Sequence, residues 1–184
     1  MNLKKYIILI YYMKSIDKFS NTSDYLPILN GAIIADLIVL FIVYYTPYFN
    51  SFFLKKWYES YRLSAVIADV LILVIGIIVA RFIFSRFNIS WNIYKFTGLV
   101  VLIQIIHDVL FYIFFMSVPK GVNKMLDLFK NYGKEVGIKA ILGDSFMIII
   151  AVLFSWYFAN LSLNNNIIIL IFLVYLIPYI IYTV

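Results

Sequence analysis

The chain alternates between long apolar runs and short polar connections. Five of the apolar runs are long enough to cross a bilayer, because its hydrocarbon core of about 30 Å needs about 20 helical residues. We expect spanning helices over residues 26–46, 64–84, 96–118, 140–159 and 167–182. Pro47 and Pro119 follow the first and third runs, where a proline is expected to end a helix. Pro178 lies inside the fifth run, where a lipid-embedded helix tolerates it.

Two further segments have the patterns of helices that lie on a membrane surface. The apolar run Tyr6–Met13 is too short to span and is flanked by lysines, which predicts an interfacial helix over residues 3–18. This helix belongs to an N-terminal segment, 1–25, that precedes the bundle at 26–184. In the connection 119–139, apolar residues recur at helical spacing, which predicts an amphipathic helix. The basic side chains expected to face the membrane surface there are Lys120, Lys124, Lys130, Lys134 and Lys139.

The connection between the first two spans, residues 44–61, is dense in aromatic residues. Tyrosine and tryptophan collect at the depth of the lipid headgroups, so we interpret this cluster as an interfacial aromatic belt. An aromatic stacking site for a ligand is the alternative.

Composition agrees with a membrane protein and excludes a soluble one. Hydrophobic residues make up 65% of the chain and charged residues 13%, against about 45–50% and about 25% in soluble domains. The fold class expected is therefore all-α: a polytopic bundle of about five spanning helices. The net charge of +6 comes from residues between the apolar runs, which favours contact with anionic headgroups over nucleic acid. These charges divide almost evenly between the two sides, so they leave the orientation undetermined.

A short sequence ending in aspartate recurs once in each of the first four spans. It reads Ile-Ala-Asp at Asp36 and Asp69, Ile-His-Asp at Asp108 and Leu-Gly-Asp at Asp144. The spacing of about 33 to 39 residues suggests a repeated unit of helix and connection, with alternating topology. Intramembrane carboxylates are expensive, so these residues are expected to face the interior of the bundle.

Their positions along each span suggest two different roles. Asp69 and Asp144 lie in the first turns of their spans, where we expect interfacial anchoring or capping. Asp36 and Asp108 lie deeper, near the midplane. Arg81, near the far end of the antiparallel second span, is the expected ion-pair partner of Asp36.

The third span carries one polar face, formed by Gln104, His107 and Asp108. These residues stand at i, i+3 and i+4, so they point in the same direction. They form either a hydrogen-bonded seam between helices or, together with Asp36, a proton or ion site. One histidine beside one carboxylate does not suffice for zinc, which takes three or four ligands, so no metal is expected.

Small residues four positions apart predict close helix packing. They occur at Gly31 and Ala35, at Gly76 and Ala80, and at Ala151, Ser155 and Ala159. Because Ala35 adjoins Asp36, the small and acidic faces of the first span are neighbours, which places the acid toward the bundle.

The motifs of nucleotide-binding loops, hydrolase elbows and helical zinc proteases are absent from the sequence. The sequence therefore predicts no cofactor and no enzymatic activity.

The stretch Gln104–Met147 also supports a resemblance. Its segments Gln104–Tyr112, Pro119–Asn123, Asp127–Tyr132 and Ala140–Met147 resemble a group of uncharacterised multi-pass membrane proteins of large DNA viruses of algae and protists. The resemblance covers about a quarter of the chain. It implies a viral membrane protein, located in an internal virion membrane or a host endomembrane.

Two functions follow from these observations. The first is a structural or scaffolding role in a membrane, with lipid, capsid or other membrane proteins, or a second copy of the chain, as partners. The alternative is a small oligomeric transporter or channel for protons or cations, which uses the intramembrane aspartates and the histidine.

Overall fold

The computed structural model describes residues 13–182, and within that range the chain is helical. In chain order the elements are η1 (Thr22–Asp24), α2 (Tyr25–Tyr45), α3 (Phe52–Tyr61), α4 (Leu63–Arg86), α5 (Ile93–Ser117), α6 (Lys124–Val136), α7 (Ile138–Phe158) and α8 (Leu163–Ile181). Five of them, α2, α4, α5, α7 and α8, are long and apolar enough to cross a bilayer. The all-α class, the multi-pass architecture and the predicted set of five spans are therefore confirmed.

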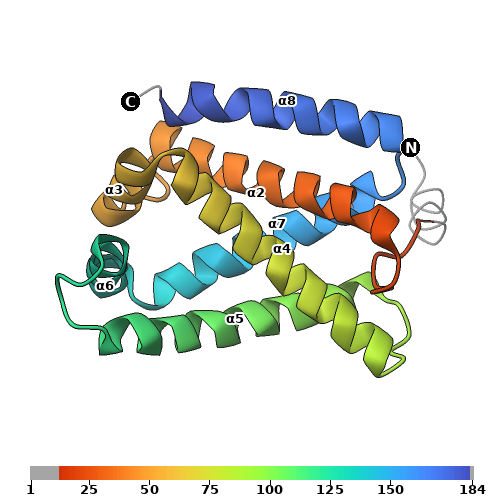
Figure 1. Ribbon diagram of the computed structural model, residues 1–184, viewed down its shortest axis with the longest axis horizontal. Helices are drawn as coiled ribbons and strands as arrows, with labels where there is room; N and C mark the ends of the chain where they lie inside the picture. The colour runs from red at the N-terminus through yellow and green to blue at the C-terminus, as the bar shows by residue number, and fades with distance from the viewer. Residues whose placement is uncertain (1–12, 183–184) are drawn as a thin grey trace.

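Spans α4, α7 and α8 pack against α2, α5 packs against α4 and α7, and the two short helices lie together at one end. Figure 1 shows α8 along one side of α2, α7 behind it, α4 crossing in front and α5 farthest from α8. Helices α3 and α6 lie side by side at the end where α2 and α5 finish and α4 and α7 begin (Figure 1). Residues 13–24 and the α4–α5 and α7–α8 connections lie at the opposite end.

Burial differs strongly between the spans. For α2, 61% of its most apolar stretch is buried, whereas the same share is 17% for α5. The outer face of α5 exposes large apolar side chains such as Leu102, Leu110 and Ile113. Such a surface suits contact with hydrocarbon rather than water, so α2 is the central helix and α5 a peripheral one.

The closest helix approach joins α2 to α7 at Gly31. A Cβ built on Gly31 would lie 2.6 Å from the carbonyl oxygen of Ala151 and 2.6 Å from the backbone nitrogen of Ser155, and would also collide with the Ser155 hydroxyl. The Ser155 hydroxyl is itself satisfied, because it donates to the carbonyl of Ala151 at 2.6 Å. The predicted small-residue contact is thus present, with α7 as the partner of α2.

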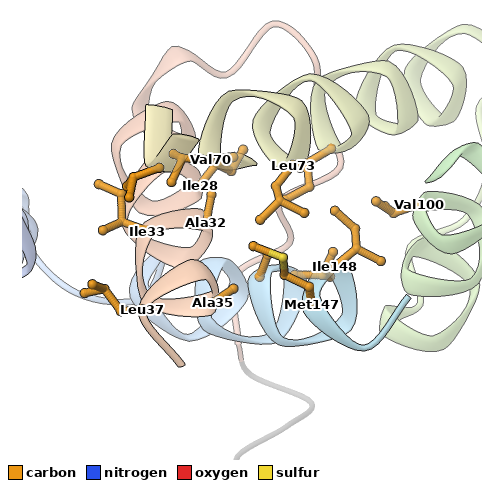
Figure 2. Close-up of a cluster of buried hydrophobic side chains, with 14 of the residues drawn as sticks. Ile28, Ala32, Ile33, Ala35, Leu37, Val70, Leu73, Val100, Met147 and Ile148 are labelled. Atoms are coloured by element: carbon orange, nitrogen blue, oxygen red, sulfur yellow. The ribbon is translucent and has the colours of Figure 1, made fainter. Parts of the chain in front are cut away.

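A continuous apolar layer fills the middle of the bundle. Figure 2 shows side chains from α2, α4, α5 and α7 meeting there, among them Ile28, Leu73, Val100 and Ile148. Each of these four has at most 2% of its surface exposed. These four helices therefore share one buried apolar core.

Polar residues fix where several helices begin. Asn92 accepts hydrogen bonds from the backbone N–H groups of the first turn of α5, and Asn123 does the same for α6. Ser51 and Ser162 cap α3 and α8. Gly137 has φ of +56° between α6 and α7, a conformation that residues with a Cβ rarely adopt, so the chain turns there without a loop.

The surface segments agree with the sequence only in part. The amphipathic helix expected within 119–139 is confirmed as α6. Of the interfacial helix expected over 3–18, residues 3–12 lie outside the described residues, and 13–18 are not helical. The prediction of a helix is wrong for 13–18, where the chain instead runs across the bundle end and donates from Lys14 N to Asn160.

Replacing Gly31 by alanine should separate α2 from α7. Because the new methyl group would meet backbone atoms rather than a flexible side chain, we expect a loss of about 1–3 kcal/mol in stability. Gly98→Ala is the matched control, since a Cβ at Gly98 has no atom within 4 Å and alanine favours helix. Thermal unfolding in detergent measures both, and an equal effect of the two substitutions would contradict the packing described.

Candidate functional site

The four repeated aspartates converge at the end of the bundle where α3 and α6 lie. Asp69 and Asp144 are each six residues after the start of their helices, about 9 Å along the axis. Asp36 and Asp108 are each nine residues before the end of theirs, about 14 Å along it. Because α2 and α5 finish at the end where α4 and α7 begin (Figure 1), all four carboxylates lie at a similar depth.

Three of these carboxylates line one cavity of about 200 Å³. The polar and aromatic residues of its wall are Phe49, Trp57, Tyr58, Asp69, Gln104, His107, Asp108, Phe111, Phe129, Tyr132, Asp144 and Phe146. Asp36 lies directly behind this wall, fully buried, and its Oδ1 accepts a hydrogen bond of 3.1 Å from the Tyr58 hydroxyl. The lining contains no lysine or arginine that could neutralise these carboxylates.

The polar face predicted on the third span is present on α5. Gln104 Nε2 donates to Asp108 Oδ1 at 2.7 Å, and His107 Nδ1 lies 3.2 Å from the same oxygen. The other carboxylate oxygen of Asp108 is buried without a hydrogen-bond partner. The three side chains therefore act as one group, with one acceptor position of Asp108 left unsatisfied.

Helix α3 contributes two donors that the sequence interpretation missed. Trp57 Nε1 donates to Asp69 Oδ2 at 3.1 Å, and the Tyr58 hydroxyl donates to Asp36. Both side chains are at least 98% buried. The segment 44–61 is thus more than an interfacial belt, because its second half folds back over the acidic cavity.

A sequence signal for α3 does exist. Ser51 is a favourable N-cap residue, and four of the apolar or aromatic residues after it stand at 54, 57, 58 and 61, the spacing of one helix face. The abundance of aromatic residues concealed this periodicity.

Tyr58 of α3 and Tyr132 of α6 keep their hydroxyl protons. Burial and the nearby carboxylates of Asp36 and Asp69 raise the pKa of Tyr58 well above its ordinary value. Burial, followed by the charge of Asp144, raises the pKa of Tyr132 in α6 as well. Both hydroxyls can therefore donate to carboxylates over the whole physiological pH range.

The capping role expected for Asp69 and Asp144 is wrong. Neither caps a helix: α4 follows Arg62 and α7 follows Gly137, and neither start has a side-chain cap. Asp69 instead accepts from the indole of Trp57, and Asp144 lines the cavity. Their shallow positions reflect the end from which each helix enters, since the cavity lies close to that same end.

The expected partner of Arg81 is also wrong. Its guanidinium lies at the opposite end of the bundle, where Nη2 is 3.3 Å from Asp24 Oδ2 and donates to the carbonyl of Lys18 at 2.6 Å. Lys14 contacts the other oxygen of Asp24 at 2.8 Å. Arg81 therefore neutralises Asp24, and Asp36 is left to Tyr58.

The five lysines of the connection 119–139 divide into two groups. Four of them are exposed, as expected for a membrane-facing surface: Lys120, Lys124, Lys134 and Lys139. Lys130 is half-buried instead, and its ammonium donates to the carbonyl of Val118 and lies 3.5 Å from Asp127. It joins α6 to the preceding turn.

Residues 13–182 contain no group of three or more histidine, aspartate or glutamate side chains placed to hold a metal ion. The arrangement is a hydrogen-bonded acidic cavity with aromatic walls.

The chain matches no family model, no curated protein sequence and no solved structure.

A carboxylate on α6 holds α3 in place over the cavity. Glu135 accepts from the Ser51 hydroxyl at 2.6 Å and from the backbone N–H groups of Phe52 and Phe53 at 2.9 and 3.1 Å. Burial by itself would raise the pKa of Glu135. The three hydrogen bonds together lower the pKa by more than burial raises it, so the pKa lies below its ordinary value. The N-terminus of α3 is also where the helix dipole favours an anion.

The contact between Glu135 and α3 should make stability depend on pH. Since the pKa is lower in the folded protein, its contribution is complete above the unfolded value of about 4.3 and is lost as the pH falls through the folded value. We expect Glu135→Gln to melt below wild type at pH 7, with the difference shrinking in acid. Exposed Glu59→Gln should melt like wild type at both pH values. A Glu135→Gln difference that persists unchanged at pH 3 would contradict this account.

Proposed function

We propose that this multi-pass membrane protein binds protons or other cations in the acidic cavity and moves them across the membrane. One observation carries the proposal: carboxylates from four spanning helices converge without a lysine or arginine in the cavity lining. Arg81 and Lys14 show that the fold can supply cations to a buried acid, because Asp24 has both. The absence of such a partner from the cavity is therefore a property of this site.

The energetics favour a bound cation or proton. An ionised carboxylate at the centre of a membrane helix costs about 2.5–3.5 kcal/mol on insertion scales, and neighbouring carboxylates repel each other. Hydrogen bonds from Trp57, Tyr58 and Gln104 reduce this cost without removing the charges. Protons or cations must supply the remaining neutralisation, and an arrangement that is costly without a ligand is typical of functional sites.

The residues divide into ligands and positioning groups. Asp69, Asp108 and Asp144 are the proposed ligands, because they line the cavity. His107 contacts Asp108 and is the only imidazole in the chain, so it is the proposed partner for proton exchange. Tyr58 positions Asp36 behind the wall.

The buried apolar side chains of Figure 2 adjoin this arrangement. Leu73 and Met147 form part of the cavity wall and also belong to the buried core. Transport therefore requires a second arrangement in which this layer opens, as in alternating access.

A scaffolding role is the second candidate, and buried polar contacts between helices favour it. Asn30 Nδ2 donates to the carbonyl of Asn166 at 2.9 Å, which joins α2 to α8, and such bonds hold membrane helices together. In that case the acidic cavity would be part of the same seam. A location in a viral internal membrane or host endomembrane stays a prediction in either case.

Flux measurements separate the two functions. Purified protein in liposomes should dissipate an imposed gradient in at least one of four parallel arms, which use a pH-sensitive dye, a dye for Na⁺, a dye for K⁺ and a labelled organic ammonium ion. We expect Asp108→Asn and Asp144→Asn each to reduce the flux at least tenfold, and Glu59→Gln to conduct like wild type. Liposomes that stay tight with wild-type protein in every arm, or unaltered flux in both variants, would favour the scaffold.

Stability measurements test whether the acids at the two ends differ in role. Asp24→Asn removes one partner of a buried ion pair, and we expect it to lose about 3–5 kcal/mol. Asp144→Asn removes a charge that has no cationic partner, so it should be as stable as wild type or more so, as is common at functional sites. Equal losses in thermal unfolding would indicate that Asp144 is structural too.

A further inference from the structure

A second cavity adjoins the first and shares its acidic residues. It measures about 390 Å³ and lies between α5, α6 and α7. Asp108, Asp144, Phe111, Phe129 and Tyr132 line both cavities. The rest of the second lining is apolar or aromatic and carries no further charge: Val109, Tyr112, Phe115, Gly133, Gly137, Ile138, Ala140 and Ile141.

Aromatic rings form a continuous wall along the two cavities. The ring centroids of Trp57 and Phe129 are 4.7 Å apart, those of Phe111 and Phe129 are 5.5 Å apart, and those of Phe111 and Phe115 are 5.4 Å apart. Faces of such rings attract cations, and they do so best for organic ammonium groups that shed water easily. The wall therefore favours a different cation from the one that an oxygen cage would select.

A bare metal ion fits this site poorly. Calcium takes six to eight oxygen ligands and magnesium a near-ideal octahedron, whereas the described side chains offer no group of three placed for a metal. An organic ammonium ion needs only one or two carboxylates and an apolar surface for the remainder of the molecule.

We infer that the cargo of this site is an organic ammonium ion with an apolar body. This inference rests on the proposed function. The ammonium lies between Asp108 and Asp144, where the two cavities meet, and the unpartnered carboxylate oxygen of Asp108 belongs to this pair. The apolar body occupies the second cavity beside Phe115 and Ile141. A cavity of this size is within the range of small-molecule sites.

Two sources supply this chemistry: a free amine, or the amino headgroup of a phospholipid. Both combine an ammonium with an apolar part, which in the phospholipid is its acyl chains beyond the phosphate and glycerol. The probe for the shared chemistry is 4-phenylbutylammonium, with 4-phenylbutanol as its uncharged analogue and tetramethylammonium as a cation without an apolar body.

Binding is measured by calorimetry on the full chain in phosphatidylglycerol nanodiscs, with empty nanodiscs subtracted. We expect saturable binding of 4-phenylbutylammonium, and affinities at least tenfold lower for 4-phenylbutanol and tetramethylammonium. Asp144→Asn should weaken the amine at least tenfold, whereas Glu59→Gln should bind it like wild type. Adding phosphatidylethanolamine to the nanodiscs separates the sources: a lower apparent affinity indicates that the headgroup competes, and an unchanged one indicates a free amine.

A cavity-filling variant tests the apolar half independently of the charges. Ala140 lines only the second cavity, so Ala140→Leu should weaken 4-phenylbutylammonium at least fivefold more than tetramethylammonium. Circular dichroism and melting temperature confirm that the variant folds. The inference is overturned if the amine and Na⁺ bind equally, or if Ala140→Leu has no selective effect. In either case the proposed function stays in place if flux still depends on Asp144. Loss of that dependence overturns the proposed function itself.

Discussion

The structure depends on how it neutralises carboxylates that hydrocarbon would otherwise surround. At one end Asp24 meets two cations and helps to tie residues 14–24 to α4. At the other end the acids meet hydrogen-bond donors, and no lysine or arginine joins them in the cavity lining. Donors satisfy lone pairs but leave the charge, whereas lysine and arginine neutralise it. Under the proposed function, this difference gives one end a role in stability and the other a role in binding.

The two short helices make the acidic end possible. Two successive segments, α2–α3–α4 and α5–α6–α7, each consist of a span, a short surface helix and a returning span. Each contributes two of the repeated aspartates, so the repeat visible in the sequence corresponds to a helical hairpin rather than to a single helix. Because both hairpins turn at the same end (Figure 1), their surface helices meet, and the Glu135 contact holds them together.

Hydrophobic run length was enough to predict the class and the five spans, because the bilayer sets the length of a spanning helix. Helical spacing likewise identified α6 and the shared face of Gln104, His107 and Asp108. That Asp69 and Asp144 lie beside Asp36 and Asp108 was not predicted, because depth was counted from the start of each span although alternate spans enter from opposite ends. The partners of Arg81 and Asp36 could not be predicted. Those of Arg81 lie in residues 14–24 and that of Asp36 lies in α3, and tertiary contacts set the positions of both segments.

The close approach at Gly31 has a mechanical consequence. There is no room for even a methyl group between α2 and α7 at Gly31. The two helices can therefore neither slide nor rotate against each other without breaking the contact, and they keep a fixed relative position. Helix α5, which buries least, is the element with most freedom to swing. It carries Asp108 and His107 in the lining of the acidic cavity, so one tilting motion would alter the geometry of these two side chains and lipid access at the same time.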